Sequence, residues 1–186
     1  LMNKHPPKIL RYLLPNFAGI LWMAGFFEVF LMGRKMINAD GDLALHLNLG
    51  KYILNSGEVP LQDVFSHTMP GQPVIQHEWL TAVIFVGINR IFGLEGIIFL
   101  CALLISTTFY LLFKHLKSKS QTLLLVFLKE FIVMVISMIH WLARPHLFTF
   151  LLMTLWLIAL DQLRGGKLKH WWVFPVIMLL WVNLHG

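Results

Sequence analysis

The chain has 186 residues, of which 58% are hydrophobic and only 13% are charged, and its formal net charge is +6. A soluble domain carries about 25% charged residues, and several apolar runs approach the ~20 residues that cross a bilayer core, so a soluble globular domain is excluded. The lysines and arginines stand in short clusters between apolar runs, which indicates membrane topology rather than nucleic-acid binding. Cys101 is the single cysteine, which excludes a disulfide framework and a cysteine-based metal site.

The first predicted element is a membrane span over residues 13–33. Residues 1–12 carry Lys4, Lys8 and Arg11, and such a basic flank predicts a cytoplasmic N-terminus. No small-residue cleavage site follows the apolar run, so we expect a retained span rather than a signal peptide. The next part of the chain therefore lies on the outer side of the membrane.

Residues 39–80 are the one long polar segment and are predicted to form an outer loop. The loop holds five of the nine acidic residues, namely Asp40, Asp42, Glu58, Asp63 and Glu78. Within it, residues 42–55 predict a short helix at the membrane interface, with Leu45, Leu49, Tyr52 and Ile53 as its apolar stripe. Alternation of leucines from 43 to 49 also permits a strand.

The remaining spans follow over residues 81–186, which makes the whole chain a single transmembrane domain. Residues 77–113 form either two short spans or one crossing in which 77–92 lies at the interface. The spans then cover residues 121–141, 147–160 and 171–184, which gives five or six transmembrane helices in an all-α integral membrane fold. If residues 77–113 cross the membrane only once, both later basic clusters, 114–119 and 164–169, lie on the cytoplasmic side. The positive-inside tendency favours this arrangement.

Asp40 and Asp42 form a D-x-D pair at the outer end of the first span. Two such carboxylates suit a divalent cation that bridges a phosphate, or one of them suits the removal of a proton from an acceptor hydroxyl. The structural alternative is that an aspartate caps the helix that begins near Leu43, since Asp is a favoured N-cap.

Further candidates lie in the loop and beside the later spans. His77 and Glu78 could serve as acid and base or orient a substrate, and the alternative is that they cap a membrane helix. His46 and Asp63 are two more candidates in the loop, for which the alternative role is to stabilise a turn. Arg144 and His146 lie in a tight polar turn over residues 142–146. A guanidinium there is suited to bind the phosphate of a lipid-linked substrate, and the alternative is that it reaches a lipid headgroup at the membrane surface. Asn183 and His185 end the last apolar run, and polar side chains there usually face the bundle or a cavity.

Three ionisable residues lie inside predicted spans: Glu28, Lys129 and Glu130. Such residues are functional hypotheses by default, and structural pairs between helices are the alternative. Lys129 and Glu130 are adjacent and point about 100° apart on a helix, so each needs another partner.

Several motifs resemble those of a group of bacterial polytopic membrane proteins that is similar to the GT-C glycosyltransferases. The motifs are Asp40-x-Asp42, His46-Leu47, Gly50, Pro60-x-x-Asp63-x-Phe65-Ser66, Gly71 and His77-Glu78-Trp79-Leu80, then Ala143-Arg144-Pro145-His146, then Leu180-Trp181-x-Asn183-Leu184-His185-Gly186. The resemblance covers about residues 15–186 and implies the N-terminal part of a longer protein.

The resemblance implies an enzyme of the bacterial inner membrane that moves a sugar from a polyprenyl-phosphate donor to an acceptor at the outer face. Asp40 or Asp42 would be the catalytic base or help to hold a divalent cation, Mg²⁺ or Mn²⁺. Arg144 and His146 would address the donor phosphate, while His46, His77 and Glu78 would shape the acceptor side. The alternative is a non-catalytic accessory subunit of a larger membrane complex.

Overall fold

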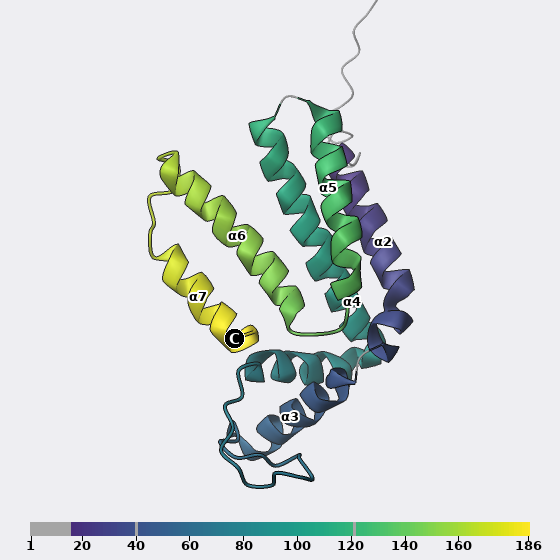
Figure 1. Ribbon diagram of the computed structural model, residues 1–186, viewed down its shortest axis with the longest axis vertical. Coiled ribbons are helices and arrows are strands. Elements are labelled where there is room, and N and C mark those ends of the chain that lie inside the picture. The colour runs from purple at the N-terminus through teal and green to yellow at the C-terminus, as the bar shows by residue number, and fades with distance from the viewer. Residues whose placement is uncertain (1–15, 40, 121) are drawn as a thin grey trace, which may run out of the picture.

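The computed structural model describes residues 16–39, 41–120 and 122–186 (Figure 1). The helices are α2 (Phe17–Asn38), α3 (Asp42–Ser56), α4 (Trp79–Lys119), α5 (Leu123–Ser137), the 3-10 turn η1 (Met138–His140), α6 (His146–Arg164) and α7 (Val173–Leu184). No strand occurs among the described residues; Gln62 and Pro73 form an isolated bridge. The predicted all-α fold is confirmed, whereas the basic flank 1–12, the start of the first span and Asp40 lie outside the described residues.

Four helices are long and apolar enough to cross a membrane: α2, α4, α5 with η1, and α6. α7 is apolar but has only 12 residues. The chain therefore has several candidate membrane-spanning helices, as expected, while the number of five or six spans stays a prediction. Asn16 caps the start of α2, because its side chain accepts a hydrogen bond from the Gly19 N–H at 2.8 Å, and the helix runs to Asn38 rather than ending at Gly33.

α4 changes direction at Gly93, where φ is 66° and ψ is −164°. Positive φ is open to glycine without steric cost, so this residue lets two helical segments join at an angle. Figure 1 shows the segment before Gly93 lying across the end of the bundle beside α3, and the segment after it running along the bundle. This geometry is the one expected of a single crossing that follows an interface segment.

The basic clusters and the polar loop lie at opposite ends of the bundle. Figure 1 shows the α4–α5 connection and the end of α6 at one end, and α3, the turn before α6 and the C-terminal residue at the other. Lys119 and Asp161 form an ion pair of 2.5 Å across the first of these ends. The basic clusters and the polar loop therefore lie at opposite ends of the helices, as a single crossing over residues 77–113 would require.

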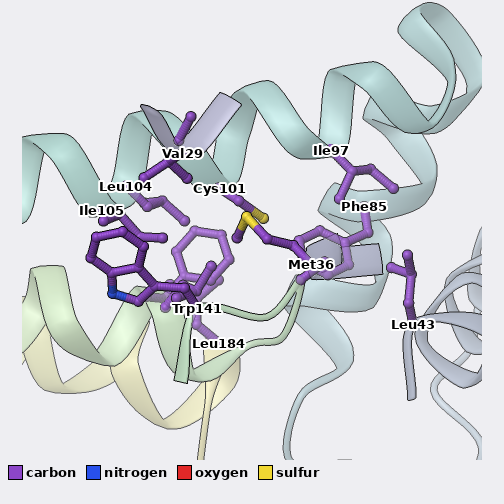
Figure 2. Close-up of a cluster of buried hydrophobic side chains, with 14 of the residues drawn as sticks. Val29, Met36, Leu43, Phe85, Ile97, Cys101, Leu104, Ile105, Trp141 and Leu184 are labelled. Carbon is purple, nitrogen blue, oxygen red and sulfur yellow. The ribbon is translucent and has the colours of Figure 1, made fainter. Parts of the chain in front are cut away.

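The core gathers around the second segment of α4, which packs against α2, α5 and α6, while α3 and the end of α7 contact the first segment. Figure 2 shows Val29 of α2 beside Ile105 of α4, with Trp141 packed below them. Two glycines allow the close approach of neighbouring helices. A Cβ atom at Gly33 would lie 2.1 Å from the Ile98 side chain, and one at Gly50 would lie 2.1 Å from the Ala82 carbonyl oxygen.

The loop helix α3 is confirmed within one residue of its predicted end, and its predicted apolar stripe is buried in part. Leu49 and Ile53 are buried, but Leu45 and Tyr52 are exposed, and His46 and Gly50 are buried in their place. The buried face is rotated because Gly50 is where α3 approaches α4, and a glycine adds nothing to a hydropathy pattern. The residue that caps α3 is Gly41, with no side-chain cap hydrogen bond, so Asp42 is not an N-cap.

Candidate functional site

Four segments that are far apart in sequence meet at the loop end of the bundle. They are the first turn of α3, the start of α4, the turn over residues 141–145 and the end of α7. The turn is fixed to the end of α2 because the Ala143 N–H donates to the Met36 carbonyl at 3.3 Å, and Ala143 is fully buried. The chain thereby presents side chains of three of its motifs to one another.

The first contact is an ion pair between Asp42 Oδ2 and Arg144 Nη2 at 2.9 Å. Asp42 is in the first helical turn of α3, and Arg144 is in the turn that precedes α6. Both side chains are partly exposed, so the pair contributes only about 0–1 kcal/mol to folding. Its structural consequence is that a carboxylate and a guanidinium stand together at the surface.

The second contact places Glu78 between two histidines. Glu78 Oε2 lies 3.6 Å from His46 Nε2, and Glu78 Oε1 lies 3.6 Å from His185 Nε2. The side chain of His46 is only 7% exposed, and its ring meets Phe85 edge to face. These distances exceed those of direct hydrogen bonds, so each contact becomes an ion pair only when the imidazole is protonated.

A hydrogen-bond chain orients His185. Trp181 Nε1 donates to Thr149 Oγ1 at 2.9 Å, and Thr149 Oγ1 lies 2.8 Å from His185 Nδ1. Because the Thr149 hydroxyl already accepts from Trp181, it is free to donate its own hydrogen to His185 Nδ1. In that tautomer the His185 proton is on Nε2, the ring nitrogen that faces Glu78. Burial lowers the pKa of His185 below its ordinary value of 6.5 and favours this neutral form.

Asn183 joins α7 to the start of α4. Its Oδ1 accepts from Trp79 Nε1 at 2.7 Å, and the fully buried Thr81 donates to the Leu184 carbonyl at 2.7 Å. Asn183 Nδ2 donates to the Leu179 carbonyl at 2.7 Å. These bonds fix the two elements that carry Glu78 and His185.

A pocket of about 280 Å³ opens beside Glu78. His46, His77, Glu78 and Gly186 line it together with Leu45, Leu49, Ile75 and Gln76. The pocket thus holds three of the predicted acceptor-side residues, although His77 itself is exposed.

Two predicted residues have other surroundings. Asp63 accepts hydrogen bonds from the Phe65 and Ser66 N–H groups at 2.9 and 2.8 Å, which lower its pKa below the ordinary value, Ser66 most strongly. It does not line the pocket, and its contacts are those of a loop turn. His146 Nε2 lies 2.5 Å from the His140 carbonyl, with its ring 6.4 Å from that of His185.

Sequence reasoning did not select Thr149, Thr81, Trp79 or Trp181 as site residues. The tryptophans stand inside the motifs that carry the resemblance, and that position was a usable signal. Thr149 lies in an apolar run with no motif around it, so only the fold reveals its contact with His185.

The metal prediction is not tested by this geometry. Among the described residues, no group of three or more His, Cys, Asp and Glu side chains is arranged to hold a metal ion. Asp40 lies outside those residues, and the carboxylate of Asp42 pairs with Arg144. No step below depends on a cation.

No model of a protein family, no curated protein and no solved structure matches this chain.

Proposed function

We propose that this chain belongs to a membrane glycosyltransferase of the GT-C type, which transfers a sugar from a polyprenyl-phosphate donor to an acceptor hydroxyl. One observation carries the proposal. The three motif segments that resemble such enzymes lie up to about a hundred residues apart, yet they contact one another through the pairs Asp42–Arg144, Glu78–His185 and Trp79–Asn183.

The reaction needs a proton acceptor and a group that stabilises the departing phosphate. The acceptor oxygen forms a bond to the anomeric carbon, the bond from that carbon to the phosphate oxygen breaks, and polyprenyl phosphate leaves with the electron pair. The hydroxyl proton passes to a carboxylate, a role that we assign to Asp42 or Asp40. Arg144, adjacent to Asp42 at 2.9 Å, is suited to the phosphate because its guanidinium binds such oxygens bidentately.

The pocket beside Glu78 is assigned to the acceptor. On this proposal Glu78 accepts hydrogen bonds from sugar or lipid hydroxyls, and its carboxylate lies between the imidazoles of His46 and His185, 3.6 Å from each. On this proposal the loop end of the bundle faces outward from the bacterial inner membrane, and the basic clusters face the cytoplasm.

Substitution of both aspartates tests the proposal. The protein is purified in detergent and incubated with polyprenyl-phosphate hexoses and a bacterial membrane extract that supplies acceptor hydroxyls, and the release of polyprenyl phosphate is measured. We expect the double variant Asp40→Asn plus Asp42→Asn to lower release by about a hundredfold or more, since general-base catalysis contributes about 10²–10⁴. Asp63→Asn is the matched control, because an asparagine oxygen still accepts from Phe65 and Ser66, and it is expected to change release less than about twofold.

Two results would contradict the proposal. One is full release by the protein that carries both Asp40→Asn and Asp42→Asn, and the other is a wild-type protein that releases polyprenyl phosphate from no donor of the panel. The second result favours the accessory-subunit alternative when the chain also copurifies with a larger complex.

A further inference from the structure

A second cavity lies inside the helical bundle, away from the loop end. Its volume is about 210 Å³, and residues of α2, α4 and α5 line it together with Trp141. Figure 2 shows three of its lining residues, Val29, Ile105 and Trp141, side by side. An apolar cavity of about 150 Å³ is already large enough to bind benzene, so this one accommodates a small organic molecule.

Two carboxyl groups from different helices line this cavity, Glu28 of α2 and Glu130 of α5. Glu130 is 8% exposed, and its Oε2 has no hydrogen-bond partner within the part of the chain that the structure describes. A buried carboxyl oxygen that lacks a donor is costly. The indole N–H groups in the cavity wall are engaged elsewhere, that of Trp22 with Thr107 and that of Trp141 with Ser137.

The rest of the wall is rich in aromatic rings. They are Trp22, Phe109, Tyr110, Phe113, Phe127, Phe131 and Trp141. Ring faces attract organic cations, most strongly where water is excluded. Two carboxyl groups among aromatic rings therefore make a site whose chemistry is complementary to an ammonium group on an apolar body.

The depth of Glu130 along its helix distinguishes a phospholipid amine from an amine that carries no phosphate. It is the eighth of the 15 residues of α5, so each end of that helix lies about 10 Å away along its axis. The ammonium of a phospholipid is tied to a phosphate at the membrane surface and does not reach this depth. Glu28, on the cavity wall, is exposed on the bundle surface, which leaves a lateral entrance.

We propose that the cavity between α2, α4 and α5 binds a lipophilic amine that carries no phosphate, with its ammonium group on Glu130 and Glu28 and its apolar body against the aromatic rings. The site is separate from the pocket of the proposed sugar transfer, because among the described residues the two share no lining residue and Trp141 is the one cavity residue that belongs to the turn over residues 141–145.

The probe is 4-fluorophenethylamine, and its neutral counterpart is 4-fluorophenethyl alcohol. Binding is followed by fluorine NMR with the protein in phosphatidylcholine nanodiscs. We expect the amine to bind saturably and at least about tenfold more tightly than the alcohol, because a hydrogen bond to a charged group is worth more than a neutral one. Glu130→Gln is expected to remove at least about tenfold of the amine affinity.

Two further variants complete the test. Glu95→Gln is the matched control, since Glu95 also lies in a membrane-crossing helix but does not line this cavity, and it should leave affinity within about twofold. Gly25→Leu keeps both carboxyl groups and fills the cavity: a Cβ at Gly25 meets no atom within 4 Å, so the side chain enters open space and should abolish binding without unfolding.

Equal binding of amine and alcohol would overturn the proposal. So would undiminished amine binding by either the Glu130→Gln or the Gly25→Leu protein, or an absence of saturable binding to the wild type.

Discussion

At the scale of single residues, Thr149 positions His185, and no sequence motif predicts this contact. It connects Trp181 to His185 by two hydrogen bonds of 2.9 and 2.8 Å, and so determines which ring nitrogen of His185 carries the proton. A change at Thr149 should therefore alter the chemistry at Glu78 without touching Glu78.

Thr149→Val should shift His185 toward the tautomer protonated on Nδ1, because the hydroxyl hydrogen that holds Nδ1 as an acceptor is lost. Nitrogen chemical shifts of labelled His185 measure the two tautomers directly. Sugar transfer should fall by about fivefold, which corresponds to one hydrogen bond of about 1 kcal/mol. Thr149→Ser should restore both values.

Thr154→Val is the matched control for that change. Thr154 lies on the same helix, and among the described residues its hydroxyl bonds to the Phe150 carbonyl of that helix alone. If Thr149→Val leaves the tautomers as in the wild type, or if Thr154→Val shifts them equally, the orientation of His185 by Thr149 is refuted.

His185 also predicts a pH dependence of folding stability. Burial lowers its folded-state pKa below 6.5, so the unfolded chain binds more protons in this range. The contribution of His185 to stability is therefore complete above about pH 6.5 and is lost as the pH falls from there toward the folded-state pKa. Thermal unfolding of wild type and His185→Asn across pH 7.5 to 5 measures it: the wild type should lose more stability than the variant, and parallel curves would contradict this.

At the scale of elements, the position of α3 depends on Gly50. A Cβ atom there would lie 2.1 Å from the Ala82 carbonyl oxygen, which is backbone and has little room to move. α3 carries both Asp42 and His46, so the spacing between α3 and α4 sets the geometry of the whole site.

Gly50→Ala should destabilise the protein by about 1–3 kcal/mol, the usual cost of overpacking, and should lower transfer activity as α3 moves away from Glu78. Thermal unfolding and the release assay measure the two effects. Gly41→Ala is the control, because a Cβ at Gly41 meets no atom within 4 Å. A Gly50→Ala protein as stable and active as the wild type would show that α3 is not held this closely.

At the scale of the whole molecule, the separation of the two ends of the bundle carries the prediction of sidedness. Thr68 is exposed in the loop, and Ser118 is exposed in the opposite basic cluster. In intact cells, a membrane-impermeant maleimide should label Thr68→Cys and leave Ser118→Cys unlabelled. Cys101 is fully buried and should not interfere. Labelling of Ser118→Cys alone would reverse the proposed orientation.

The sequence allowed some of this to be predicted for clear physical reasons. Long apolar runs predicted the long helices. The helical spacing of apolar residues in the loop predicted α3 to within one residue of its end. Half of the predicted stripe of α3, Leu45 and Tyr52, is exposed, because Gly50 forms part of the buried face by being small. The contact of Trp79 with Asn183 joins residues 104 positions apart, and no local pattern contains it.

The bend at Gly93 has a consequence for how reactants arrive. It turns the start of α4 sideways, so Glu78 and its pocket stand at the rim of the bundle instead of at the top of a vertical helix. On the proposed function, a lipid-borne reactant that diffuses within one leaflet therefore reaches the pocket by a two-dimensional search.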